Sequence, residues 1–150
     1  MSASDRSTSD GHELVITRIF DAPRDLVWQA WTDHEQAKQW GPKGFTTPER
    51  EMDFRVGGAW YAVMISPEGR EYRQHGVVRE VVPPERLVFT LIWDDTPDNE
   101  MLVAITFAER GGKTEMTFRQ TGLRTAESRD GHESGWNEAF DRFEELLARA

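Results

Sequence analysis

The chain has 150 residues, no cysteine and a formal net charge of -9 at pH 7. This length fits one domain with a sizeable core, and the lack of cysteine excludes disulfides, thiolate nucleophiles and cysteine-based metal sites. The negative charge argues against nucleic-acid and membrane partners, because phosphate backbones and anionic lipid surfaces repel it.

Residues 1–12 are polar and are predicted to form a disordered tail, followed by a single domain over residues 13–150. The tail lacks the apolar segment of a secretory signal. No apolar run approaches the ~20 residues that a helix needs to cross a bilayer. We therefore expect a cytoplasmic location.

The segment ELVITRIF, at 13–20, is rich in β-branched and aromatic residues and predicts a first strand. Residues 21–33 follow with helical spacing, and another turn or two is expected over 34–40 before Gly41 and Pro42 end it. The apolar stripe of the first of these helices consists of Val27, Ala30 and Trp31. A pair of short helices is thus predicted after the first strand.

Residues 47–121 alternate with period two and carry turn signals at short intervals, which predicts six strands joined by hairpins. Short connections require antiparallel neighbours, so the sheet should be antiparallel and have about seven strands. The six strands are expected at 48–56, 59–66, 70–82, 86–93, 101–110 and 113–121.

The last segment predicts a long amphipathic helix over about 126–149, with Thr125 as its N-cap. Its apolar stripe, at i, i+4, i+7 and i+11, consists of Trp136, Phe140, Phe143 and Leu147. At roughly 35 Å the helix could cross the concave face of a twisted sheet. The expected fold class is α+β, with a sheet of about seven antiparallel strands wrapped around this helix and two short helices between strands one and two.

Six segments carry a resemblance that covers nearly everything after residue 12. They are FDAPRDLVWQAWTD, QWGPKGFTTPE, MDFRVGGAW, GVVREVVPPERLVFT, MLVAITF and DGHESGWNEAFDRFEELL. In this order and spacing they resemble the START-like helix-grip (SRPBCC) superfamily, and within it the family named for the activator of the ATPase of the ninety-kilodalton heat-shock protein. The resemblance implies a helix-grip fold with a cavity between the long helix and the sheet. It implies no single activity, because the family includes lipid or polyketide binders, cyclase-like proteins and co-chaperones.

Two glycines, Gly131 and Gly135, interrupt the predicted C-terminal helix. Each costs about 1 kcal/mol relative to alanine in a helix interior. We expect them where a side chain would block close approach of the sheet, the short helices or a bound molecule.

Aromatic residues supply most of the candidate ligand contacts. Trp40 and Phe45 flank the GPKG segment, and Trp136 is expected to face them from the long helix. A mainly apolar cleft with a few polar groups is typical of small-molecule sites. The predicted ligand-binding residues are Trp40, Phe45, Trp60, Tyr72, His75, Trp93, His132, Gly135, Trp136 and Phe140.

The histidines are scattered, and no pair has metal-ligand spacing, so neither a metal nor another cofactor is predicted. His75 lies in a strand with polar residues in both registers, which leaves open the face it occupies. His132 lies near the start of the final helix, where a structural hydrogen bond is favoured over contact with a ligand.

These features favour a protein that binds a small hydrophobic or amphipathic molecule without covalent chemistry, and no catalytic residue is assigned. Two alternatives stay open. The resemblance implies the first, an activator of a chaperone ATPase that acts in the stress response with the chaperone as its partner. The second is a cyclase- or hydrolase-like enzyme in which His75 or His132 works with a nearby Glu or Tyr.

Overall fold

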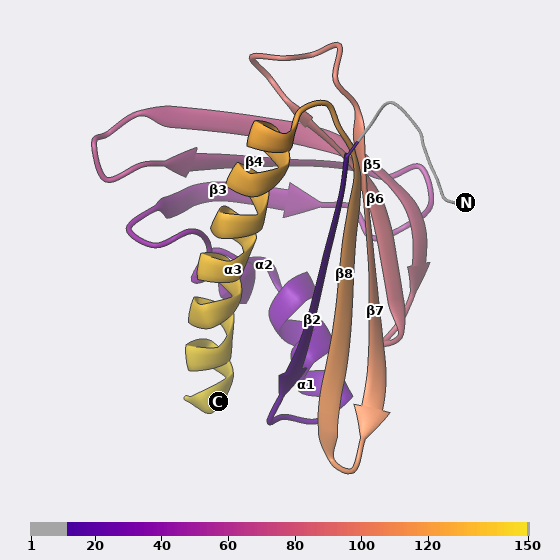
Figure 1. Ribbon diagram of the computed structural model, residues 1–150. Coiled ribbons are helices and arrows are strands. Elements are labelled where there is room, and N and C mark those ends of the chain that lie inside the picture. The colour runs from indigo at the N-terminus through magenta and orange to yellow at the C-terminus, as the bar shows by residue number, and fades with distance from the viewer. Residues whose placement is uncertain (1–11, 150) are drawn as a thin grey trace.

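A computed structural model describes residues 12–149 of the chain as one sheet, two short helices and one long helix (Figure 1). The predicted α+β helix-grip class is confirmed. Residues 1–11 of the predicted tail lie outside the described residues, and the first strand begins at His12, one residue earlier than expected. The elements are β2 (His12–Phe20), α1 (Arg24–Thr32), α2 (His34–Ala37), β3 (Thr46–Met52), β4 (Ala59–Ile65), β5 (Glu71–Val82), β6 (Arg86–Trp93), β7 (Met101–Arg110), β8 (Lys113–Leu123) and α3 (Ala126–Ala148).

The seven strands form a single antiparallel sheet in the order β2-β8-β7-β6-β5-β4-β3. The chain therefore runs as a meander from β3 to β8, and β2 completes the sheet beside β8. In Figure 1, β3 and β4 run across the view, whereas β2, β7 and β8 run from top to bottom. This twist gives the sheet a concave face, which α3 crosses.

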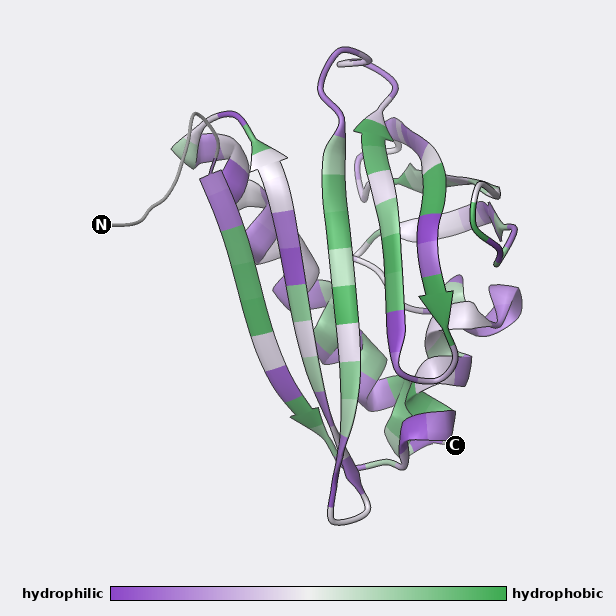
Figure 2. Cartoon of the chain, turned by 90° about the vertical axis from the view of Figure 1, so that its right-hand side faces the viewer, coloured by the Kyte–Doolittle hydropathy of each residue, from purple (hydrophilic) through white to green (hydrophobic). Residues whose placement is uncertain are grey.

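Alternation along the strands gives the sheet one buried and one exposed face. In β7 the side chains of Met101, Val103, Ile105 and Phe107 are buried, and Leu102 between the first two is exposed. Figure 2 shows the alternation as apolar and polar bands along the strands, with the helices behind them. The buried face is the one that packs against the helices.

The two short helices begin as local chemistry predicts. Pro23 is the N-cap of α1, where its missing N–H is not needed, and its carbonyl accepts from the backbone of Leu26 and Val27. The predicted stripe on α1 is buried. The side chain of Asp33 caps α2 by accepting from the backbone N–H of Glu35.

The strand predicted to run to residue 56 ends earlier, at Met52. Residues 53–58 form a tight turn in which Gly58 N–H donates to the carbonyl of Arg55 over 2.8 Å. A Cβ atom at Gly58 would lie 2.1 Å from the carbonyl oxygen of Asp53, so only glycine fits this turn. The close approach of the Gly58 and Asp53 backbones therefore ends β3 at Met52, although the period-two sequence pattern continues to residue 56.

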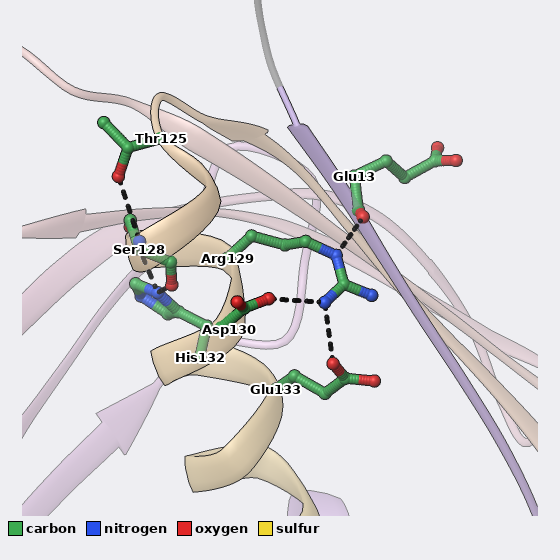
Figure 3. A network of polar contacts seen from close by, with 7 residues as sticks. All are labelled: Glu13, Thr125, Ser128, Arg129, Asp130, His132 and Glu133. Atoms are coloured by element: carbon green, nitrogen blue, oxygen red, sulfur yellow. Dashed lines mark hydrogen bonds and ion pairs between the residues drawn. The ribbon is translucent and has the colours of Figure 1, made fainter.

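Polar contacts fix the first turns of α3 on two sides (Figure 3). As predicted, Thr125 caps the helix, and its side chain accepts from the backbone N–H of Ser128 over 3.0 Å. Arg129 donates to the carbonyl oxygen of Glu13 on β2 over 3.0 Å and pairs with Glu133 over 2.7 Å. These contacts hold the N-terminal end of α3 against the edge of the sheet.

The C-terminal half of α3 packs into a solid core. Phe140 and Phe143 are completely buried, and the ring centroids of Phe143 and Phe20 lie 5.0 Å apart. Trp40 packs edge-on against Phe143 with the centroids 4.8 Å apart. The predicted stripe is confirmed, because Trp136 and Leu147 also pack against this core. Any open space must therefore lie beside the N-terminal half of the helix.

Candidate functional site

A cavity of about 730 Å³ lies between the N-terminal half of α3, the concave face of the sheet and the segment that links α2 to β3. Its volume is within the range of small-molecule sites, and its lining is mainly apolar. The sheet contributes Thr47, Arg50, Met52, Trp60, Ala62, Met64, Tyr72, Gln74, Phe89, Leu91 and Trp93, and Asp95 follows β6. The helices and the linking segment contribute Trp31, Ala37, Trp40, Gly41, Pro42, Phe45, Ser128, Gly131, His132, Ser134, Gly135, Trp136, Glu138 and Ala139.

The face of α3 toward the cavity carries the two unusual glycines. A Cβ atom built at Gly131 or at Gly135 would meet nothing within 4 Å outside its local chain. The expectation that side chains here would collide with the sheet or the short helices is therefore wrong. The glycines instead leave this wall of the cavity flat, and the space in front of them is open.

Indole rings form much of the aromatic wall, and hydrogen bonds fix four of them, Trp40, Trp60, Trp93 and Trp136. Trp40 donates to the carbonyl of Ala30 over 3.0 Å, and Trp60 donates to the carbonyl of Thr90 over 2.7 Å. Trp136 donates to the side-chain oxygen of the buried Gln120 over 2.9 Å. Rings held in this way give the cavity a preformed shape, which lowers the entropy cost of binding a rigid apolar molecule.

Two residues of α3, Arg142 and Glu138, attach the segment before β3 to the helix, and Glu138 accepts from the backbone N–H of Lys43 over 3.0 Å. Nη1 of Arg142 donates to the carbonyl oxygens of Gly41, Pro42 and Phe45 over 3.0–3.3 Å, and Nη2 donates to that of Gln39. Because these carbonyls belong to one short segment, Arg142 holds Phe45 at the cavity wall. The ring of Phe45 then packs against Tyr72 of β5, with the centroids 5.9 Å apart.

His132 bridges the helix and the sheet at the edge of the cavity. Its Nε2 accepts a hydrogen bond from the indole N–H of Trp93 over 2.9 Å, and its Nδ1 lies 2.8 Å from the carbonyl oxygen of Ser128. An indole N–H only donates and a carbonyl only accepts, so the ring is neutral with its proton on Nδ1. The predicted structural hydrogen bond is present, and the two contacts together occupy both ring nitrogens.

The structure places all the predicted site residues in the cavity lining except His75 and Phe140. His75 is exposed on the other face of β5, where Nδ1 lies 2.7 Å from a carboxylate oxygen of Asp94. Gln74 lines the cavity instead, because the register that contains Tyr72 and Gln74 is the inward one. The placement of His75 in the cavity is thus wrong.

Phe140 lies within the core, outside the cavity lining. Its ring packs against Phe118 with the centroids 5.4 Å apart and against Trp136 at 5.6 Å, and none of its surface is exposed. Ala139, one residue earlier, is the last residue of α3 in the lining. Phe140 is therefore a core residue that packs behind the lining residue Trp136, and it is not itself a wall residue.

One polar wall residue, Arg50 on β3, was not predicted. Its Nη2 donates to the carbonyl oxygen of Trp31 at the end of α1 over 3.2 Å, while its Nη1 is buried without a partner. Burial lowers the pKa of Arg50 to about 10. Arg50 precedes Met52 by two residues, so period-two alternation alone could have placed it on the buried face.

Within residues 12–149 no group of three or more His, Asp or Glu side chains could hold a metal ion. In the same part of the chain, each helix is too short or too polar to cross a bilayer. The cavity, with one arginine in an aromatic and aliphatic wall, is therefore the main candidate site.

Comparison with known proteins gives a consistent result. The family model described as "Activator of Hsp90 ATPase homolog 1-like protein" matches residues 21–148. A solved structure from Nitrosomonas europaea is 29% identical over 91% of this chain and 94% of that chain, with a TM-score of 0.81. The AHSA1 protein from Silicibacter pomeroyi is 29% identical over 91% and 98%, with a TM-score of 0.82. A protein from Chromobacterium violaceum is 26% identical over 90% and 96%, with a TM-score of 0.83. No curated protein matches the chain.

Proposed function

Since this chain belongs to the family of Activator of Hsp90 ATPase homolog 1-like proteins, whose model matches it over residues 21–148, we propose that it binds a small molecule in the cavity of its helix-grip fold. The ligand is hydrophobic or amphipathic, and binding involves no covalent chemistry. The observation that carries this proposal is the open cavity of about 730 Å³ in front of Gly131 and Gly135. Gly131 and Gly135 destabilise the helix, and their presence at the cavity wall is explained if a ligand occupies the space in front of them.

Mass spectrometry of the intact protein under native conditions, after purification without denaturation, tests the proposal. The expected result is a protein with an added mass that disappears on denaturation and identifies the class of ligand. A protein that carries no added mass and takes up none from a lipid and metabolite extract contradicts the proposal.

A matched pair of variants assigns the binding to the cavity. Gly135→Leu adds a side chain that projects into the cavity, and Ala126→Leu adds comparable bulk to an exposed position on the same helix outside the lining. The bound mass should be lost from the first variant and kept by the second. Equal retention in both would place the ligand elsewhere.

The description of the family favours a second candidate, an activator of a chaperone ATPase. The test is the ATPase rate of the Hsp90-type chaperone from the same cell, measured with and without this protein. An increase that Gly135→Leu leaves unchanged would separate this activity from the cavity. If the ATPase rate does not increase and the chaperone does not bind this protein in a pull-down, this candidate function is excluded.

The enzyme alternative has no observation in its favour. His75 is outside the cavity, and both ring nitrogens of His132 already have hydrogen-bond partners. A general acid or base needs a nitrogen within reach of a substrate proton.

A further inference from the structure

A row of paired residues crosses the sheet beneath the cavity. Arg50 on β3 pairs with Ala62 on β4, Ala62 pairs with Gln74 on β5, and Gln74 pairs with Trp93 on β6. All of them line the cavity. Adjacent strands lie about 4.8 Å apart, so the backbones of Arg50 and Gln74 are separated by about 10 Å. The short side chain of Ala62 between them leaves room for a guanidinium and a carboxamide to meet one group of a ligand.

Arg50 carries a charge that the protein does not neutralise. No carboxylate of residues 12–149 forms an ion pair with it. Arg50 also borders a smaller outer recess of about 340 Å³ that Glu35, Glu49 and Glu51 line, but burial is the cause of its lowered pKa. A buried charge without a partner is unfavourable, and an anion beside it removes much of that cost.

The buried side-chain atoms that lack a hydrogen-bond partner in residues 12–149 are all donors. In the described part of the chain, the buried side-chain nitrogens without a hydrogen bond are Nη1 of Arg50, Nε1 of Trp31 and Nε of Arg24. Arg50 and Trp31 both line the cavity, and a hydrogen bond joins them. The Gln74 amide makes only a weak contact with the sulfur of Met64, at 3.9 Å. The two buried donors of the lining, Nη1 of Arg50 and Nε1 of Trp31, therefore have no acceptor within the described part of the chain.

We propose that the cavity ligand is an amphipathic carboxylate, with its carboxylate bound by Arg50 and Gln74 above Ala62 and its apolar body between the indoles and α3. In this complex the guanidinium turns so that Nη1 meets a carboxylate oxygen, while Nη2 keeps its bond to Trp31. Charge-assisted hydrogen bonds of this kind are about twice as strong as neutral ones. The acidic lining residues, Asp95 and Glu138, lie apart from this row: Asp95 is exposed to solvent, and Glu138 accepts from the backbone N–H of Lys43. This inference rests on the proposed function and specifies the ligand's polar group.

The test compares probes that share a ring and differ in the polar group: 2-naphthaleneacetate, 2-naphthaleneethanol and 2-(2-naphthyl)ethylamine. Calorimetry gives their affinities for the whole protein. The acid should bind about tenfold or more tightly than the alcohol, and the amine most weakly. Arg50→Met should abolish the preference for the acid and leave the affinity for the alcohol nearly unchanged. Arg73→Met, which removes an exposed arginine of β5 that pairs with Glu71, is the matched control and should keep the preference.

A second variant keeps the test decisive if Arg50→Met unfolds. Gln74→Met leaves the bond from Arg50 to Trp31 intact and should reduce the preference severalfold. In the wild type, an alcohol that binds as tightly as the acid overturns the carboxylate assignment but leaves the proposed function in place. If none of the probes binds in the cavity of the folded protein, the proposed function fails together with this inference.

Discussion

The indole N–H of Trp93 donates to Nε2 of His132 over 2.9 Å and thereby joins the end of β6 to the first turns of α3. Both residues line the cavity, so this bond fixes the distance between two of its walls. With the contacts of Thr125 and Arg129, it explains how α3 stays in place although the space beside it is open.

Replacing Trp93 by phenylalanine tests this role. Trp93→Phe removes the donor and should lower the free energy of unfolding by about 1 kcal/mol, the usual net value of one hydrogen bond. Amide exchange in the first two turns of α3 should become faster. Trp28→Phe is the control, because Trp28 packs edge-on against Phe107 and, within residues 12–149, its ring has no hydrogen bond or aromatic contact with α3. Equal effects of the two changes would contradict the role of the bond.

Two glycine-to-alanine substitutions should change the free energy of unfolding in opposite directions. Gly135→Ala adds a methyl group into open space within a helix, and its stability should rise by about 0.5–1 kcal/mol. Gly76→Ala places a Cβ atom 1.9 Å from the carbonyl oxygen of Thr90 and 2.4 Å from Nε1 of Trp60, and should cost about 1–3 kcal/mol or more. Chemical denaturation measures both. Destabilisation by Gly135→Ala would mean that the cavity wall is packed.

Arg142→Met should release the segment before β3. Four carbonyl oxygens lose their donor, so the amides of Lys43 and Phe45 should exchange with solvent about tenfold faster or more, while those of β7 stay protected. Ligand dissociation should also accelerate, since Phe45 lines the cavity. Arg149→Met, at the exposed end of the same helix, is the control. Unchanged exchange at Lys43 and Phe45 would show that other contacts hold the segment.

Alanine substitutions of Phe140 and Phe45 should distinguish a core position from a position in the cavity wall. Phe140→Ala empties a completely buried position and should cost about 3–5 kcal/mol of stability. Phe45→Ala affects a half-buried ring at the cavity wall and should cost about 1 kcal/mol, with a clear loss of ligand affinity. Thermal unfolding and calorimetry with a naphthalene probe distinguish the two. A larger loss of stability from Phe45→Ala would contradict these placements.

Much of the fold follows from local patterns. The turn signals at Gly57-Gly58, Pro83-Pro84 and Gly111-Gly112 predict the meander, and the helical spacing of Phe140 and Phe143 predicts the buried face of α3. The end of β3 was harder to predict, because a tight turn at Asp53 follows from the close backbone approach at Gly58 rather than from hydropathy.

The site was predictable where aromatic residues dominate and harder to predict where polar residues occupy both faces of a strand. In β5, His75 and Gln74 are both polar, and only the pairing of β5 with β4 and β6 shows that Gln74 faces inward. Arg50 was missed for a similar reason, since a charged side chain on an edge strand is usually solvated. The role of Gly131 and Gly135 required the position of the opposite wall, which local sequence does not contain.

The most direct test of ligand binding in the cavity is a titration of the protein with 2-naphthaleneacetate, followed through the indole N–H signals of its six tryptophans by NMR. We expect saturable shifts for Trp40 and Trp136, a much smaller one for Trp28, and loss of the shifts in Gly135→Leu but not in Ala126→Leu. If the probe binds but leaves Trp40 and Trp136 unshifted, or if Gly135→Leu does not affect binding, the ligand does not occupy this cavity.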